Sequence, residues 1–182
     1  MKNKFNKQIY FKLEALQPSG SFKLRGIGRH CQQEILRGAQ SLVASSGGNA
    51  GVAVAYSGMK LNVPTTVFIP STSNPIYIEA IKSYGAQVIV SGTTSGDAQL
   101  AAQDFAKQHN APYIHPFDHH EIWAGHATMM DEVATQMSKP DAVIVSVGGG
   151  GLACGVLQGM HQNGWQDVPF IAVETIGADV FA

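Results

Sequence analysis

The stretch 142–159, AVIVSVGGGGLACGVLQG, runs from an apolar strand through four consecutive glycines into a helix. Backbone N–H groups at the start of a helix have no partner within the helix, and the helix dipole favours an anion there. Glycines let the backbone come close to such an anion because they carry no Cβ. A tight turn alone needs one or two glycines, so the four at 148–151 predict a phosphate-binding loop that follows a strand of an α/β sheet.

Two kinds of phosphate ligand fit this loop. Gly148, Gly150 and Ala153 match the G-x-G-x-x-A spacing of dinucleotide-binding turns. Glu174 ends the next predicted strand, where a ribose-binding carboxylate would lie. The loop by itself therefore does not separate a nicotinamide dinucleotide from a smaller phosphate cofactor.

Outward from this loop, the whole chain alternates strand and helix patterns. Strands are expected at 9–13, 41–45, 65–69, 87–91, 113–115, 142–147 and 170–174. Helices are expected at 21–37, 49–60, 96–109 and 151–163, from Ser73 or Asn74 to just before Gly85, and from His119 or His120 to Met137. This alternation predicts an α/β fold with parallel or mostly parallel sheets. The strands are apolar on both faces, so helices are expected on both sides.

The order of the elements also suggests one domain inserted into another. Seams are expected near 41–49 and along the long helix before Met137. Residues 41–125 would then form a small domain, and residues 1–40 and 126–182 a large cofactor domain. The large domain has few strands of its own, so we expect its sheet to be incomplete and the chain to be truncated.

Composition excludes several classes of partner. Twelve Lys and Arg residues against thirteen Asp and Glu give a net charge of -1, without a basic stripe, which argues against nucleic acid and anionic membranes. The apolar runs fall far short of the roughly 20 residues that span a bilayer. Cys31 and Cys154 lie far apart in the sequence, which indicates buried or half-buried thiols in a reducing compartment, the cytoplasm, and no disulfide framework. The histidines at 115, 119, 120 and 126 do not share one helix face, so no metal site is predicted from them.

A second polar loop, ASSGGNAG at 44–51, follows another predicted strand. A helix cap by Ser46 or Asn49 explains one polar residue, but not two serines, an asparagine and two adjacent glycines. Serine and asparagine side chains beside free amides suit a carboxylate. We therefore predict a carboxylate-binding loop here.

The third motif, PSGSFKLRGIG at 18–28, has a lysine at its centre. Lys23 follows a polar turn and the aromatic ring of Phe22. A lysine amine acts as a nucleophile only when burial or nearby positive charge lowers its pKa from about 10.4. The commonest reason to hold such a lysine is a Schiff base with an aldehyde. Pyridoxal 5'-phosphate carries both an aldehyde and a phosphate, so one ligand would use the lysine, the glycine loop and the asparagine loop together.

These motifs, with VPFIAVETIGA at 168–178, resemble in this order those of the fold type II pyridoxal-phosphate enzymes, the tryptophan synthase β superfamily. Among them the chain looks most like the L-serine dehydratases of the serine/threonine dehydratase family. The resemblance runs from about Ile9 onward. It implies that Lys23 forms the Schiff base and then acts as base and acid at the substrate Cα. It also implies that Phe22 packs on the pyridine ring and Asn49 hydrogen-bonds the ring's 3-hydroxyl oxygen.

Three further groups of residues take their roles from the same resemblance. Those expected to hold the substrate carboxylate are Ser46, Gly47, Asn49 and Ala50. Those expected to hold the cofactor phosphate are Gly148, Gly149, Gly150 and Gly151. Those expected around a monovalent cation such as K+ are Gly148, Glu174 and Ala178.

The reaction that the resemblance implies is β-elimination of L-serine to pyruvate and ammonia, with L-threonine giving 2-oxobutanoate. The partner would be a small amino-acid substrate, and the assembly a homodimer. A cysteine-synthase-like β-replacement enzyme and a non-catalytic fragment are the alternatives. Family members have a long segment after the ETIGA motif that supplies the partner of the pyridine nitrogen, and many have alanine where Gly47 stands. Both departures predict that this chain alone is poorly active.

Overall fold

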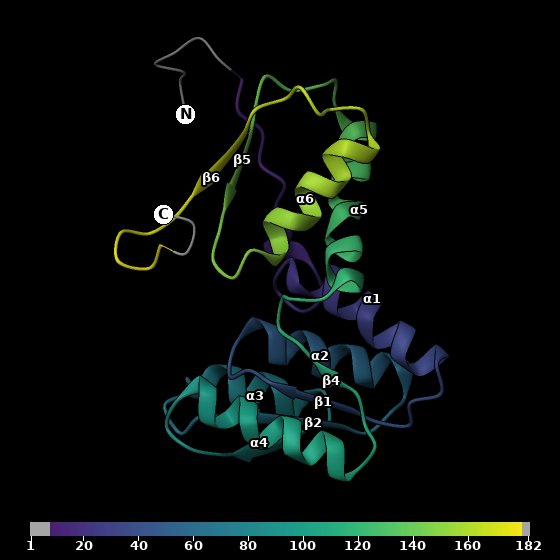
Figure 1. The fold of residues 1–182 in the computed structure, drawn as a ribbon, viewed down its shortest axis with the longest axis vertical. Helices are drawn as coiled ribbons and strands as arrows, with labels where there is room; N and C mark the ends of the chain where they lie inside the picture. Colours follow the sequence, from purple (N-terminus) through teal and green to yellow (C-terminus); the bar gives the residue numbers. More distant parts are fainter. Residues whose placement is uncertain (1–7, 180–182) are drawn as a thin grey trace.

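Two separate parallel sheets organise the chain (Figure 1). The computed structural model describes residues 8–179. The first sheet has four strands in the order β3-β2-β1-β4, with bounds β1 Leu42–Ser45, β2 Thr65–Ile69, β3 Gln87–Val90 and β4 Tyr113–Ile114. The second sheet pairs β5 (Val143–Ser146) with β6 (Phe170–Val173). All strand pairs are parallel, as the alternation of strands and helices predicts.

Helices connect the strands and cover the first sheet on both sides. Their bounds are α1 Lys23–Leu36, α2 Asn49–Leu61, α3 Pro75–Ser83, α4 Ser95–Gln108, α5 His120–Gln136 and α6 Gly151–Gln162, preceded by a short 3-10 helix η1, Glu14–Leu16. Val52 and Ile81, from α2 and α3, pack on one face of the sheet. Ala98 and Ala102 of α4 pack on the other face, against Phe68.

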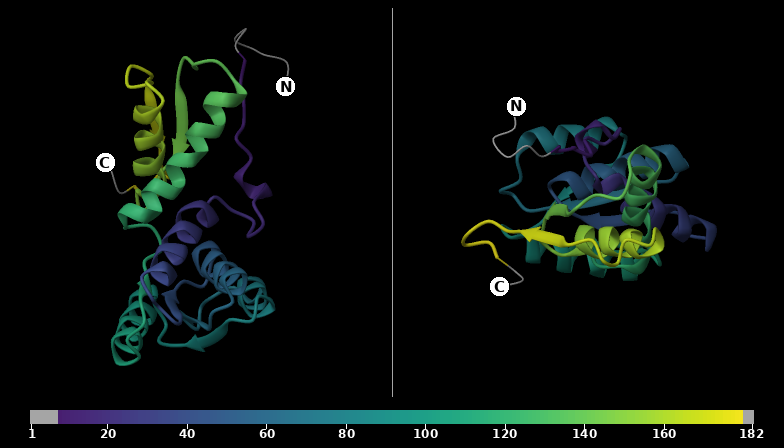
Figure 2. Two further views of the ribbon diagram at one scale, coloured as in Figure 1. Left: turned by 90° about the vertical axis from the view of Figure 1, so that its right-hand side faces the viewer. Right: turned by 90° about the horizontal axis from the view of Figure 1, so that it is seen from above.

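Within residues 8–179, helices cover the second sheet on one face only. Met129 of α5 and Val156 of α6 belong to a core cluster that packs against Val143 and Phe170. On the other face Ile144 is 68% exposed, and Val173 is also exposed. The expectation of helices on both sides is therefore correct for the first sheet and wrong for the second. Figures 1 and 2 show α5, α6 and this sheet at the opposite end of the molecule from the first sheet, with α1 between.

Local sequence signals account for most element boundaries. Asn74 caps α3 by accepting a hydrogen bond from the Ile76 N–H, and Pro75 occupies the first turn, where no N–H is needed. Gly85 follows the end of α3 with φ +80°, which favours glycine. Thr94 and Asp97 form a capping box at the start of α4. These signals fix the elements to within two residues of the expected bounds.

The expected strand at 9–13 is wrong. Residues 8–13 form no strand or helix, and no strand of either sheet pairs with them. Phe11 is 77% exposed, while Lys12 reaches Glu132 of α5 at 2.5 Å. β-Branched and aromatic residues favour a strand only where a neighbouring strand accepts their backbone, and none lies beside this segment.

The two cysteines differ in environment. Cys31 of α1 is fully buried, as expected, and burial is the main cause that raises the pKa of its thiol to about 12. Cys154 of α6 is exposed, so the expectation of burial is wrong for this residue. Both thiols are free. No helix among residues 8–179 is long and apolar enough to cross a membrane.

Candidate functional site

Lys23 begins α1 immediately after a tight turn. The Gly20 N–H donates to the Gln17 carbonyl oxygen at 2.7 Å, and Gly20 has φ +78°. The Lys23 Nζ donates to the carbonyl oxygen of Pro116 at 2.6 Å. Partial burial lowers the pKa of Lys23, and no positive neighbour contributes. The amine is thus held by a backbone carbonyl in half-buried surroundings, which make it lose its proton more readily than an exposed lysine does.

Lys23 and the glycine loop line the same cavity. This cavity has a volume of about 290 Å³, and its walls come from the start of α1, the β4–α5 connection and the β5–α6 junction. The residues that line it are Phe22, Lys23, Phe117, Ser146, Val147, Gly148, Gly149, Gly150, Gly151, Leu152 and Ala153. The structure therefore brings together two motifs that lie more than 120 positions apart in the sequence.

The glycines at 149–151 are required by close contacts and by backbone conformation. A Cβ on Gly149 would lie 2.8 Å from the ring of Phe117, and one on Gly151 would lie 2.5 Å from the Phe117 carbonyl oxygen. Gly150 caps α6 with φ +84°. The loop thus presents bare backbone at the start of a 12-residue helix, which is the arrangement that binds phosphate.

Phe117 and Pro116 form part of this site, and the sequence did not single them out. The Lys23 Nζ lies 5.7 Å from the centroid of the Phe117 ring and 5.4 Å from that of Phe22. Trp123 of α5 donates its Nε1–H to the Phe117 carbonyl oxygen at 3.0 Å. No local pattern marks this connection, because its role comes from contacts with residues far away in the sequence.

The asparagine loop lies beside α1 but outside this cavity. Ser46, Gly47, Asn49 and Ala50 form the junction between β1 and α2, as predicted. Ala50 packs in one core cluster with Ile27 of α1. Asn49 is exposed, and none of the four residues lines the cavity that holds Lys23. The predicted meeting of all three motifs on one ligand is therefore not seen as a single cavity.

The residues expected around a cation follow the two strands of the second sheet. Gly148 comes after β5 and Glu174 after β6, and the Val147 N–H donates to the Val173 carbonyl oxygen at 2.9 Å. Ala178 lies in the next turn, where its N–H donates to the Thr175 carbonyl oxygen. Across residues 8–179, no group of three His, Cys, Asp or Glu side chains is placed to hold a metal.

Arg25 fixes the first turn of α1. Its guanidinium contacts Glu14 of η1 at 2.7 Å and Glu132 of α5 at 2.8 Å. Its side chain is largely buried by these two ion pairs. The hydrogen bonds from Arg25 lower the pKa of Glu132 to about 2. These ion pairs anchor the helix turn that carries Lys23.

His126 packs directly behind the cavity. Its ring is fully buried, lies edge-on to Phe22 at 5.2 Å, and has no hydrogen-bond partner on either nitrogen. Glycines make room for it, since a Cβ on Gly26 would lie 2.7 Å from the His126 Cε1 and one on Gly155 would lie 2.3 Å from the His126 Cβ. No spacing in the sequence reveals this contact between His126 and Phe22.

We expect the protein to lose unfolding free energy in mild acid because two of its histidines are buried. Burial is the main cause that lowers the pKa of both His126 and His30 to about 4. Because the unfolded chain binds protons more readily than the folded chain, this stabilisation is present above pH 6.5 and is lost as the pH falls towards 4. For the fully buried His126 the loss is on the order of 3 kcal/mol. Urea unfolding between pH 7 and 4 should show it, and His126→Gln should remove part of the pH dependence whereas His161→Gln, at an exposed position, should not.

Pyridoxal phosphate fits the residues present in the 290 Å³ cavity. The cavity combines a half-buried lysine amine for an aldehyde, bare helix-start amides for a phosphate, and the aromatic rings of Phe22 and Phe117 for a planar ring. Ser19 and Ser21, just before Lys23 in the sequence, also have buried hydroxyls without a partner. A dinucleotide would use the glycine loop but would leave the lysine without a role.

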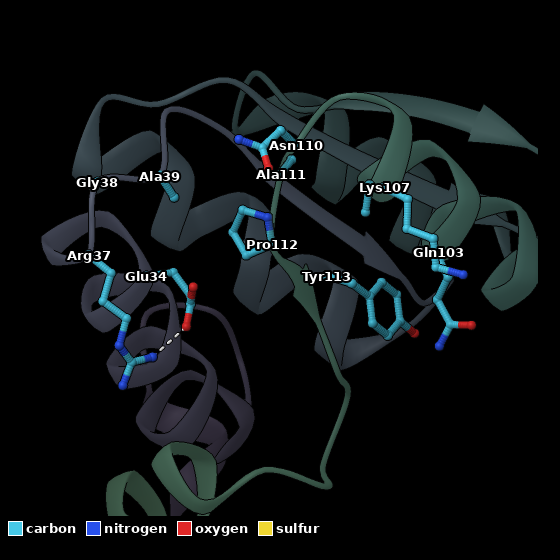
Figure 3. A pocket seen from close by; sticks show the side chains of 11 residues that line it. Glu34, Arg37, Gly38, Ala39, Gln103, Lys107, Asn110, Ala111, Pro112 and Tyr113 are labelled. Carbon is cyan, nitrogen blue, oxygen red and sulfur yellow. Dashed lines mark hydrogen bonds and ion pairs between the residues drawn. The ribbon is translucent and has the colours of Figure 1, made fainter.

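A larger hollow of about 720 Å³ lies elsewhere (Figure 3). It is bounded by the end of α1, the end of α4 and β4, and Glu34 and Arg37 form an ion pair on its wall. None of the predicted site residues lines it. Size alone therefore does not identify the site, and the residues of the smaller cavity carry the chemistry.

Comparisons with known proteins agree with this site. A family model described as "Pyridoxal-phosphate dependent enzyme" matches residues 1–182. An L-serine dehydratase of Dictyostelium discoideum is 46% identical over 189 residues, covering 97% of this chain and 54% of the relative. A human L-serine dehydratase/L-threonine deaminase is 48% identical over 177 residues, covering 95% of this chain and 53% of the relative. The chain thus spans about half the length of the curated relatives it matches.

A solved structure extends this similarity to the fold. The crystal structure of a fungal L-serine ammonia-lyase from Rhizomucor miehei matches with a TM-score of 0.88 and 39% sequence identity. The match covers 93% of this chain and 55% of that chain. The predicted α/β fold with parallel sheets flanked by helices is confirmed.

Proposed function

Because this chain belongs to the family of pyridoxal-phosphate dependent enzymes, with the fold type II architecture, we propose that it serves the β-elimination of L-serine to pyruvate and ammonia. L-threonine would give 2-oxobutanoate in the same way. The observation that carries the proposal is the single cavity lined by Lys23 and the four glycines. The names of the relatives support serine and threonine as substrates.

In this proposal the cavity residues bind the cofactor. Lys23, whose amine now donates to the Pro116 carbonyl oxygen, would hold the cofactor at its aldehyde group, and the amides of the glycine loop would hold its phosphate. Phe22 and Phe117, which line the cavity, would pack on the ring and exclude water from it. When bound, pyridoxal phosphate supplies an electron-poor ring that takes up the electron pair left when Cα loses its proton. Asn49 would hydrogen-bond the 3-hydroxyl oxygen of the ring.

The remaining residues would bind the substrate and move its proton. Ser46, Gly47, Asn49 and Ala50 would hold the substrate carboxylate at the start of α2. The Lys23 amine would take the proton from the substrate Cα. The hydroxyl would take up a proton and leave Cβ as water, and hydrolysis of the released product would give pyruvate and ammonia. Lys23 suits the role of base because burial lowers its pKa.

The same proposal includes the assembly and the surroundings of the protein. Residues 41–125 would form a small domain that closes over the substrate, and residues 1–40 and 126–182 the cofactor domain. All four strands of the first sheet fall within the small domain, which supports this division. Gly148, Glu174 and Ala178 would surround K+, and the protein would act as a cytoplasmic homodimer.

The product made from L-serine tests this function. With pyridoxal phosphate added, the protein should convert L-serine to pyruvate without a second substrate. Because turnover by this chain alone is expected to be slow, exchange of the serine Cα proton in D2O, followed by NMR, gives a second and more sensitive measurement. Exchange or pyruvate supports the proposal. Cysteine formation from an activated serine and sulfide, with neither exchange nor pyruvate from serine, would instead identify a β-replacement enzyme.

A further inference from the structure

Gly47 and Ser73 lie against each other where the loops after β1 and β2 meet. The two strands are parallel neighbours, so these loops emerge at the same edge of the sheet. A Cβ placed on Gly47 would lie 2.1 Å from the Ser73 Oγ and 2.7 Å from the Ser73 Cβ. The space that a side chain at 47 would need is therefore filled by Ser73.

Hydrogen bonds hold Ser73 in this position. The Ser71 N–H donates to the Gly92 carbonyl oxygen at 3.0 Å, and the Thr72 hydroxyl donates to the Thr93 carbonyl oxygen at 3.2 Å. The next residue, Asn74, caps α3. The Ser73 hydroxyl can rotate away from a new methyl on residue 47, but its Cβ can move only if the start of α3 moves with it.

The Ser73 hydroxyl has no hydrogen-bond partner although its oxygen is buried. Burying an unpaired hydroxyl is unfavourable, so hydrogen bonding does not explain why this side chain lies here. Its Cβ and Oγ lie where a side chain on residue 47 would have to go. We expect low activity in part because Gly47 lacks the methyl that alanine carries at this position in many family members. The structure shows instead that a neighbouring side chain occupies that space.

We propose that Ser73 is a substrate-positioning residue that supports the loop 46–49 from the side of β2. Its Cβ takes the place of the methyl that alanine would carry at position 47. This inference rests on the proposed function, in which the loop holds the substrate carboxylate. Ser73 acts through the loop and does not touch the cofactor cavity, whose lining residues do not include it.

A double-mutant cycle at positions 47 and 73 tests the proposal. Protein loaded with pyridoxal phosphate is titrated with L-serine, and binding is followed through the change in visible absorption. Ser73→Gly and Gly47→Ala should each weaken serine binding at least about 5-fold, with pyridoxal phosphate affinity unchanged, since contacting residues couple at this scale. The double variant Gly47→Ala/Ser73→Gly, which exchanges the two sizes, should recover most of the loss. Ser73→Ala keeps the Cβ and should bind serine like the original protein.

A matched control and a second measurement separate this inference from the function. Ser83→Gly removes the same atoms from an exposed serine near the end of α3 and should leave serine binding unchanged. Serine binding unaffected by Ser73→Gly, or a double variant that loses as much as both single variants combined, overturns the inference. If the original protein binds the cofactor but does not respond to serine, the proposed substrate is wrong. In that case the unfolding temperatures of the cofactor-free original protein, the two single variants and the double variant test the Ser73 contact. A shift in the double variant that differs from the sum of the two single shifts supports the contact, and a shift equal to that sum overturns it.

Discussion

Lys23→Ala protein mixed with pyridoxal phosphate will show no visible absorption from a covalent lysine adduct and no permanent attachment after borohydride reduction. The Lys23 Nζ is the lysine amine that lines the cavity with the glycine loop, and burial lowers its pKa. Methyl cannot replace an amine as nucleophile, so the expected loss is complete. Absorption spectra and mass mapping of the reduced protein measure it.

Lys107→Ala provides the control for this experiment. Lys107 is highly exposed on α4 and does not line the cavity, and Figure 1 shows α4 at the opposite end of the molecule from α6. Its removal should therefore leave the spectrum unchanged. Attachment to Lys23 in the original protein and in Lys107→Ala is the expected pattern. Reduced cofactor found at other lysines, with Lys23 unmodified, would contradict both the site and the proposed function.

The second large effect is expected at Gly151. In Gly151→Ala the new Cβ would lie 2.5 Å from the Phe117 carbonyl oxygen and 2.9 Å from the Phe117 Cβ. That carbonyl already accepts the Trp123 indole N–H, so it is not free to move. We expect overpacking to cost about 1–3 kcal/mol of unfolding free energy. The displaced helix start should also weaken pyridoxal phosphate binding by at least about 10-fold, or about 1.4 kcal/mol.

Gly148→Ala is the matched substitution in the same loop. A Cβ on Gly148 meets no atom within 4 Å, and its backbone does not require glycine. Its unfolding temperature should therefore stay close to that of the original protein, while Gly151→Ala should fall by about 2–4 °C for each kcal/mol lost. Equal unfolding temperatures for the two variants would show that the contact with Phe117 does not constrain the loop.

Local sequence signals predicted the helices and strands well because capping and turn residues act on residues close to them in the chain. The cap at Asn74, Gly85 after α3 and the glycines before α6 act within a few residues, and the structure places all three as expected. The segment 9–13 shows the limit of this reasoning. Its composition favours a strand, but a strand also needs a partner, which no local pattern supplies.

The sequence predicted those site residues whose side chain or backbone has a recognisable chemical role. It did not predict the residues that belong to the site only through packing. Lys23 and the glycine loop carry recognisable chemistry, and the structure brings them into one cavity. The contact from Lys23 to Pro116 spans 93 residues, and Phe117 enters the site through that connection. His126 and Ser73 likewise depend on glycines opposite them, which a single sequence does not pair.

The contrast between the two cysteines has a practical consequence. Cys31 is buried and strongly disfavours the thiolate, whereas Cys154 is exposed and follows Ala153, which lines the cavity. A maleimide fluorophore should therefore label the unmodified protein at one position, a single turn from the glycine loop. The emission of that dye would report entry of a ligand into the cavity without any engineered residue.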